Sequence, residues 1–215
     1  MSDEIVYTEE YRGYTINISP DIDSPNPRKE WDNLGKMVCW HKRYDLGDEM
    51  PSESPDEYRA NLAMDAITEG EYDFVFSGWK TESYHRIMRK IDKYLDDNYI
   101  IIPLYLYDHS GITISCSPFS CSWDSGQIGF IYISKAKVRE EYGWKNITSN
   151  RKSQIVKYLN TEVKTYDDYL TGNVYGFEIL SAGGESVDSC GGYSGDYNNL
   201  DYGALREAKS EINNM

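Results

Sequence analysis

The sequence predicts an α+β fold in one domain, residues 1–215, with a mixed or antiparallel sheet and three to four helices packed on it. The chain has 215 residues, of which 40% are hydrophobic and 27% charged, and that composition is enough to bury one core. Segments with helical spacing and segments with strand spacing both occur. They follow one another without the regular strand–helix alternation of a parallel sheet, which favours α+β.

The first third of the chain contains short strands and one helix. Residues 1–13 are expected to be loosely held, and the alternation at 14–18 predicts a strand. The apolar run 37–40 predicts a buried strand after the turn at Asn33, Leu34 and Gly35. Ser54, Pro55 and the acids that follow them predict a helix over 54–69, because Ser is a favoured N-cap and Pro a favoured first helical residue.

The middle of the chain holds the clearest helix and the most hydrophobic strand. Apolar residues recur at spacings of three and four over 81–97, which predicts an amphipathic helix. They are Tyr84, Ile87, Met88, Ile91, Tyr94 and Leu95. The apolar run 99–107 predicts a central strand despite Pro103, with 112–115 and 128–133 as its partners.

The last third adds two longer elements and a polar segment. Ser134 is expected to cap a short helix, and apolar spacing predicts a longer helix over 149–169. Alternation at 174–180 predicts a late strand, and 204–212 a final helix. Residues 181–203 are rich in Gly, Ser, Asp and Asn, so we expect a loop there.

The charge balance argues against direct nucleic-acid binding. The chain carries 36 Asp and Glu against 22 Lys and Arg, a net charge of −14. Such a field repels phosphates and anionic lipid unless a local basic patch offsets it. The nearest basic face, 85–93, alternates with apolar residues of the predicted helix. We therefore expect no direct contact with nucleic acid.

Acidic residues are concentrated at 45–73, which we call the acidic stretch. It contains one base, Arg59, and ten acids. The acids are Asp45, Asp48, Glu49, Glu53, Asp56, Glu57, Asp65, Glu69, Glu71 and Asp73. One interpretation is a solvated helix with loop flanks. The other is a surface that imitates the phosphates of a nucleic acid and occupies a basic groove on a partner protein.

The sequence predicts a cytoplasmic protein, because it shows no sign of a signal peptide, a membrane span or a disulfide framework. The first ten residues do not resemble a signal peptide, and the longest apolar run, nine residues at 99–107, is too short to span a membrane. The four cysteines are few and unevenly spaced, as expected for reduced thiols in a cytoplasm. No phosphate-binding glycine loop is present, and we expect no cofactor.

Residues 108–127 contain the ingredients of cysteine chemistry. Cys121 is the candidate nucleophile and His109 its base, with Asp108 or Asp124 orienting the imidazole. The alternative is a hairpin-like connection whose Asp, Ser and Gly form turns. A small Cys/His-dependent hydrolase or transferase is thus the second functional hypothesis.

A zinc site is a weaker possibility. Cys39 and His41 are two residues apart, a spacing that places both on one face of a strand. With Cys116 and Cys121 they would complete a Cys₃His set. Buried reduced cysteines without metal are common, and we expect no metal here.

Three segments resemble a family of uncharacterised proteins carried by bacteriophages and other mobile elements. They are WDNLGKMVCWHKRYDLGD at 31–48, LYLYDHSGIT at 104–113 continued by PFSCSWDSGQIG at 118–129, and YLTGNVYGF at 169–177. The family has no assigned activity, so no functional residue is carried over. The resemblance implies an accessory protein that acts in the host cytoplasm on a host enzyme, such as a restriction or CRISPR protein.

Together these observations predict an inhibitory binding protein. The expected partner is a nucleic-acid-handling host defence protein with a basic groove, bound through the acidic stretch. Neither catalysis nor membrane attachment is expected, and the sequence does not determine the oligomeric state.

Overall fold

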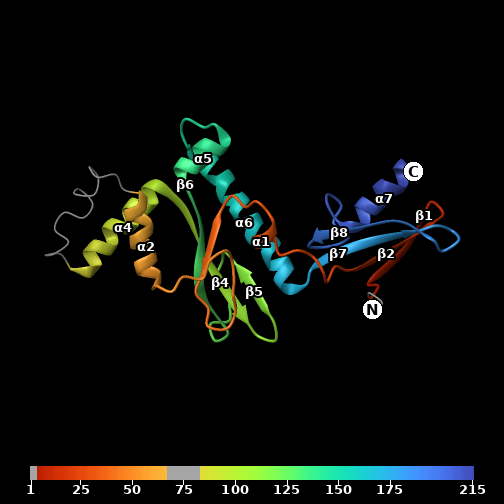
Figure 1. Ribbon diagram of the computed structural model, residues 1–215, viewed down its shortest axis with the longest axis horizontal. Coiled ribbons are helices and arrows are strands. Elements are labelled where there is room, and N and C mark those ends of the chain that lie inside the picture. The colour runs from red at the N-terminus through yellow and green to blue at the C-terminus, as the bar shows by residue number, and fades with distance from the viewer. Residues whose placement is uncertain (1–3, 67–82) are drawn as a thin grey trace. The chain divides into compact units, whose positions relative to one another are not determined.

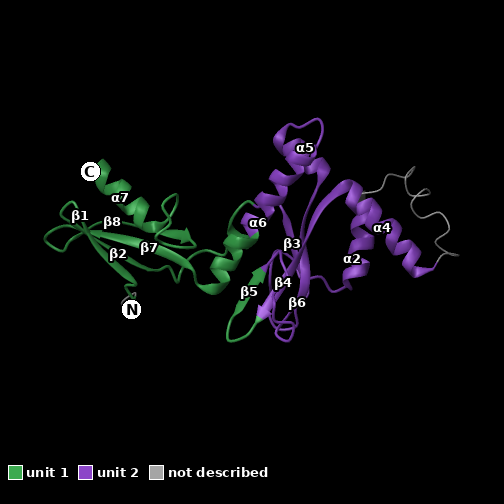
Figure 2. Cartoon of the chain, turned by 180° about the vertical axis from the view of Figure 1, so that it is seen from behind, with its two compact units in different colours: residues 1–32, 108–114, 163–215 green, residues 33–107, 115–162 purple. Residues whose placement is uncertain are grey.

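A computed structural model describes residues 4–66 and 83–215, without the side chains of residues 65 and 66 (Figure 1). Contacts divide the chain into two compact units (Figure 2). Unit 1 comprises 1–32, 108–114 and 163–215, and unit 2 comprises 33–107 and 115–162. The predicted α+β class with antiparallel sheets is confirmed, although the strands form two four-stranded sheets where we expected one. The assignment of a single domain stays a prediction.

The described residues contain eight strands and six helices. The strands are β1 Tyr7–Tyr11, β2 Tyr14–Pro20, β3 Lys36–Cys39, β4 Tyr99–Asp108, β5 Ile112–Ser115, β6 Ser125–Ser134, β7 Val174–Leu180 and β8 Ser186–Ser194. The helices are α1 Pro27–Glu30, α2 Pro55–Ala66, α4 Tyr84–Asn98, α5 Lys135–Tyr142, α6 Ser149–Thr171 and α7 Ala204–Asn214. Each predicted helix and strand is present among the described residues, and residues 67–69 and 81–82 of two predicted helices lie outside them. None of the described helices is long and apolar enough to cross a bilayer.

Unit 1 is built on the sheet β1-β2-β7-β8, in which each strand is antiparallel to its neighbours. One face of this sheet packs against α7, with Ile16, Ile18, Phe177 and Ile179 meeting the buried Ala208 and other small or apolar residues of the helix. Residues next to these in the strands point to the other face. Thr8, Asn17 and Glu178 therefore form a polar row across three strands.

Two strands of unit 1 correct the sequence-based expectations. Residues 1–13 were expected to be loose, yet β1 pairs with β2 through a two-residue turn. Arg12 and Gly13 both have positive φ, 52° and 84°, as a tight hairpin with the twist of its strands requires. Residues 181–203 were expected to be a loop, yet they contain β8. This edge strand is mostly exposed and contains adjacent glycines, so it lacks the apolar alternation that indicates a strand.

Unit 2 contains most of the second sheet, with the order β3-β6-β4-β5. The predicted central strand β4 is interior in that order, and Leu104 is fully buried. The pairing of β4 with β6 shifts register between Leu104 and Tyr105, at the point where β6 contains Gly129. A Cβ on Gly129 would lie 1.9 Å from the Val38 carbonyl oxygen in β3. Only glycine permits β3 to approach β6 this closely.

The turn before β3 is attached to the middle of α6. The Leu34 N–H donates to Glu162 Oε1 (2.6 Å) and the Gly35 N–H to Glu162 Oε2 (3.2 Å). A Cβ on Gly35 would collide with Leu159 and Ile131. The turn predicted at 33–35 is therefore fixed both by a carboxylate and by the absence of a side chain.

Helices α2 and α4 pack against the aromatic residues of this sheet. Ile91 and Leu95 of α4 are buried with Tyr58, Tyr99 and other residues of the core cluster. Ile87, Met88 and Tyr94 are half-buried against the same cluster, as their helical spacing predicts. Tyr84 is the exception on the predicted apolar face, since 58% of it is exposed. It lies in the first turn, where its hydroxyl reaches Asp56 of α2.

Helix ends follow the predicted signals. The Ser54 side chain accepts from the Glu57 N–H (3.3 Å) while Glu57 accepts from the Ser54 N–H (2.9 Å), a capping box at the start of α2. Ser134 accepts from the Lys137 N–H (3.0 Å) and caps α5. Gly143 ends α5 in the left-handed region.

Replacing Gly129 with Ala should destabilise the protein by roughly 1–3 kcal/mol, because the new methyl group displaces β3 from β6. Gly126→Ala is the matched control in the same strand, where a Cβ meets nothing within 4 Å. The control should be neutral or slightly stabilising, since alanine loses less backbone entropy on folding. Urea unfolding of both variants measures the difference, and equal unfolding midpoints would contradict the proposed close approach.

Candidate functional site

The structure describes the side chains of six of the ten carboxylates predicted to bind a partner. They are Asp45, Asp48, Glu49, Glu53, Asp56 and Glu57. Asp65, Glu69, Glu71 and Asp73 lie outside the described side chains. Asp48, Glu49 and Asp56 contact other parts of unit 2, and those contacts decide how much of the acidic stretch remains for a partner.

Asp48 and Glu49 connect the acidic stretch to β3. Asp48 Oδ2 accepts from the Met37 N–H (2.7 Å), and Glu49 forms an ion pair with Lys36. The backbone of Glu49 also pairs with Val38 in a parallel bridge. These two carboxylates therefore help to build the fold, and they are less available to a partner than their sequence position suggests.

A buried hydrogen-bonded chain continues from Glu49 into the core. The Tyr58 hydroxyl donates to Glu49 Oε2 (3.4 Å) and lies 3.0 Å from the Tyr132 hydroxyl. Burial, followed by the hydrogen bond with Tyr132, raises the pKa of Tyr58 far above its usual value. The Tyr58 hydroxyl is thus neutral at any ordinary pH, and its contact with Tyr132 fixes the acidic stretch to β6.

The carboxylates at the start of α2 are more exposed. Asp56 accepts from the Tyr84 hydroxyl, and this bond raises the pKa of Tyr84. Hydrogen bonds from Ser54 lower the pKa of Glu57, which keeps that carboxylate charged in the capping box. Asp45 is exposed and Glu53 half-buried. These four carboxylates are the part of the predicted set that stays accessible.

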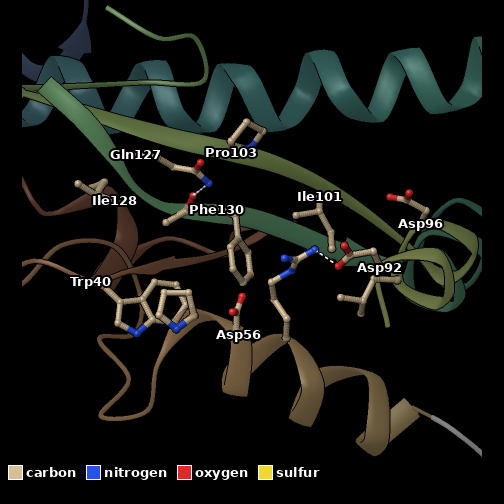
Figure 3. Close-up of a pocket in the computed structure, with 13 residues that line it drawn as sticks. Trp40, Asp56, Asp92, Asp96, Ile101, Pro103, Gln127, Ile128 and Phe130 are labelled. Carbon is tan, nitrogen blue, oxygen red and sulfur yellow. Dashed lines mark hydrogen bonds and ion pairs between the residues drawn. The ribbon is translucent and has the colours of Figure 1, made fainter. Parts of the chain in front are cut away.

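Asp56 borders a pocket of about 530 Å³ in unit 2 (Figure 3). One wall is aromatic and apolar, with Trp40, Phe130 and Ile101. The Trp40 ring lies with its centroid 5.6 Å from the rings of both Tyr58 and Phe130, and its Nε1–H donates to the Glu53 carbonyl (2.8 Å). These contacts fix Trp40 at the mouth of the pocket.

Charged residues line the same pocket. Asp56 comes from α2, Asp92 and Asp96 come from α4, and Arg59 forms an ion pair with Asp92 (Figure 3). Three carboxylates against one guanidinium leave the pocket negative. A negative pocket beside an indole ring suits a cationic group, which gains both charge pairing and a cation–π contact.

Sequence reasoning missed the residues of this pocket outside α2. Asp92 and Asp96 are four residues apart, so they share a polar side of the helix predicted over 81–97. From the sequence alone, that spacing could have indicated two carboxylates on one side of the helix. Trp40 was recognised only as part of a buried strand, and its position beside α2 depends on tertiary packing.

Unit 1 has a second acidic hollow, of about 710 Å³, over the polar face of its sheet. Asn17, Ser19 and Glu178 line it from β2 and β7, and Asp21 and Asp23 line it from the segment after β2. Among the described residues no Lys or Arg lines this hollow. Asp21 accepts from the Gly192 N–H (2.8 Å), which holds the segment against β8.

The two units differ sharply in charge. Unit 1 has 18 Asp and Glu against 6 Lys and Arg, a net charge of −12. Unit 2 has 18 against 16, a net charge of −2, although it contains the acidic stretch. The excess acid of the protein therefore lies mainly in unit 1, which sequence reasoning did not single out.

The acids of unit 2 are balanced by a basic segment at 134–160, which sequence reasoning overlooked. It has seven Lys and Arg against two Glu, a net charge of +5. The bases are Lys135, Lys137, Arg139, Lys145, Arg151, Lys152 and Lys157. They are spread over α5, the following loop and the first part of α6, so no short run of bases marks them. Counting charge over a window of this length would have found them.

The cysteine constellation gains no support from the contacts of Cys121. The Cys121 sulfur lies 3.9 Å from Asp124 Oδ2. His109 is exposed, and its backbone N–H donates to the Gly111 carbonyl (3.0 Å) in the turn after Asp108. The pairing of Cys121 with His109 stays a prediction.

The structure does not bring the Cys₃His set of the zinc hypothesis together as a metal site among the described residues. Among the described residues, no group of three or more His, Cys, Asp or Glu side chains is placed to hold a metal ion. His41 Nδ1 instead accepts from the backbone N–H groups of Arg43 (3.3 Å) and Tyr44 (3.2 Å), and its ring stacks on Tyr44. Cys39 is buried in β3. The imidazole forms a turn, so its spacing from Cys39 did not indicate a ligand pair.

Comparison with known proteins adds no further information. No protein-family model, curated protein or solved structure matches the chain. The functional argument therefore depends on the charges and contacts described above.

The four thiols should react with an alkylating reagent in a definite order at neutral pH. Cys190 is exposed and should react first. Burial raises the pKa of Cys116 to about 11, and Cys39 is buried, so both should be slow. We expect Cys121 to react no faster than Cys190. Mass spectrometry of alkylated peptides against time measures each rate, and a Cys121 that reacts fastest would instead favour the hydrolase hypothesis.

Proposed function

We propose that the protein is an inhibitory binding protein that occupies the basic, nucleic-acid-binding surface of a partner. The observation that carries the proposal is the net charge of −12 on unit 1, with a carboxylate-lined hollow on the open face of its sheet. An acidic surface of this kind attracts a basic groove over several ångströms and speeds encounter with it.

The surroundings of the unit 1 hollow favour a protein as the occupant over a small ion. Two large apolar side chains, Ile5 and Ile22, line it, and they are 53% and 69% exposed. Apolar groups beside carboxylates suit a protein surface in which basic side chains alternate with apolar ones. Exposed isoleucines gain nothing from contact with hydrated cations.

The pocket of unit 2 supplies a second contact of the same kind. Its three carboxylates and the Trp40 ring suit a lysine or arginine side chain from the partner. Asp56 thus keeps the partner-binding role expected from the sequence, and Asp92 and Asp96 join it. Asp48 and Glu49, which are engaged within unit 2, contribute mainly to stability.

The resemblance to proteins of bacteriophages and mobile elements agrees with this proposal. In that setting the partner would be a nucleic-acid-handling defence protein of the host, such as a restriction or CRISPR protein. The protein would act in the host cytoplasm.

Capture experiments test the proposal. The immobilised protein should retain nucleic-acid-binding proteins from a bacterial lysate at low salt and release them when duplex DNA is added, because both compete for one basic surface. Release should also follow added salt, since exposed charges more than about 10 Å apart are screened near 0.1 M. Retained proteins that DNA does not displace would contradict the mimicry.

Charge reversal should identify the contact surface. Asp23→Lys with Glu178→Lys alters the unit 1 hollow, and Glu53→Lys with Asp56→Lys and Glu57→Lys alters the start of α2. We expect each set to slow association with a captured protein by about tenfold at low salt, with a smaller change in dissociation. Surface plasmon resonance measures both rates.

The matched control reverses Glu140 and Glu141, which are exposed on α5 outside both acidic surfaces. This variant should associate as fast as the parent. If the control slows association as much as the two test sets do, net charge alone is responsible and the proposed surfaces are wrong.

A further inference from the structure

The basic segment forms a site of its own along the start of α6. A hollow of about 550 Å³ follows the helix there. Its lining residues are Ser149, Lys152, Ser153, Val156, Lys157 and Asn160. Their spacing places them in one stripe on the helix surface. The stripe extends over the twelve residues 149–160, or roughly 17 Å along the helix axis.

The chemistry of this stripe is that of a donor surface for anions. Two ammonium groups and two hydroxyl groups line it, and no carboxylate does. Among the described residues, no ion pair or hydrogen bond involves the side chains of Lys152 or Lys157. Asn160 directs its amide nitrogen to the Val156 carbonyl (2.7 Å), so its side chain is held in place.

The backbone of α6 adds to the positive field. Thr148 caps the helix, accepting from the Arg151 N–H through its side chain (3.4 Å) and from the Lys152 N–H through its carbonyl (2.8 Å). The stripe begins at this N-terminus, where the helix dipole favours negative charge. The N-terminus of α6 coincides with the hollow lined by two lysines and two serines, so the helix dipole and these side chains favour an anion at the same place.

Other bases of the segment converge on the same region. Lys135 Nζ donates to the carbonyl oxygens of Asp96 (2.8 Å) and Asp97 (2.9 Å) at the end of α4. Partial burial lowers the pKa of Lys135, and the neighbouring charges of Lys152 and Arg139 lower it further. Lys135, Arg139 and Lys152 thus lie near one another, and the charges of Asp96 and Asp97 act on Lys135 in the opposite direction.

We propose that this face of α6 binds the phosphates of a nucleic-acid backbone. Lysines, serine hydroxyls and a helix N-terminus are the groups that contact phosphates in protein–nucleic acid complexes. A stripe of roughly 17 Å spans about five phosphates of one strand, which follow at about 3.4 Å along the duplex axis. The contacts carry no base recognition, so binding is independent of sequence.

The lining residues favour nucleic acid over a membrane surface. A helix that lies in a bilayer interface presents a broad apolar face beside its basic residues. Here Val156 is the one apolar residue of the lining, and the rest of the stripe is polar. The stripe therefore suits a ligand that is charged throughout its length.

This site is independent of the proposed inhibitory function, and it revises the expectation that the chain avoids nucleic acid. The net charge of −14 opposes binding at a distance, so contact should be weak and confined to low salt.

The test is fluorescence anisotropy of a labelled duplex of about 20 base pairs at salt concentrations from about 50 to about 200 mM. The full chain should bind, with log K falling linearly as log salt rises. Lys152→Gln with Lys157→Gln should weaken binding and reduce the salt slope by about 2, because two phosphate contacts are lost. Binding should be the same for duplexes of unrelated sequence.

The matched control is Arg89→Gln with Lys93→Gln, two exposed bases of α4 whose loss changes the net charge equally. It should leave the salt slope unchanged. Melting curves should be alike for both variants, since all four side chains are exposed. The proposal is overturned if the parent does not bind DNA at about 50 mM salt, or if the control loses as much affinity. It also fails if vesicles of anionic lipid bind more tightly than DNA and depend on the same two lysines.

Discussion

The architecture of unit 2 depends on one close approach between backbones. The Val38 carbonyl of β3 lies where the Cβ atom of any other residue at position 129 would be. Gly129 therefore allows β3 to lie close to β6, at the point where the pairing of β6 with β4 shifts register. Trp40, directly after β3, then contacts Phe130 and Tyr58. The aromatic wall of the pocket, and the packing of α2 against it, follow from that approach. An acidic pocket with an indole at its mouth is thus a consequence of backbone geometry.

Local patterns predicted the elements of this fold, and pairing explains what they missed. The α4 helix was predictable because Ile87, Ile91 and Leu95 follow helical spacing. The strands β1 and β8 were missed because an edge strand needs few apolar residues, since each pairs on one side only, β1 with β2 and β8 with β7. The assembly of Trp40 with Asp56 and Asp92 could not be predicted, since it requires knowing which helix packs on which strand.

Three residues of the segment 31–48 serve the fold of unit 2. Gly35 fits against Leu159, and a Cβ on Gly47 would meet the Met37 carbonyl at 2.8 Å. Asp48 accepts from the Met37 N–H. These residues fix the chain from the turn before β3 to the start of the acidic stretch.

The separation of charge within unit 2 has a practical consequence for handling the protein. A chain with an isoelectric point near 4.6 would ordinarily flow through a cation exchanger at neutral pH. Local charge governs retention on a resin more than the overall sum does, because screening limits each contact to nearby groups. The net +5 of residues 134–160 gives the molecule one face that a sulfonated matrix can hold, while its acidic faces bind quaternary amines. Chromatographic behaviour of this kind reports how charge is arranged, which an isoelectric point conceals.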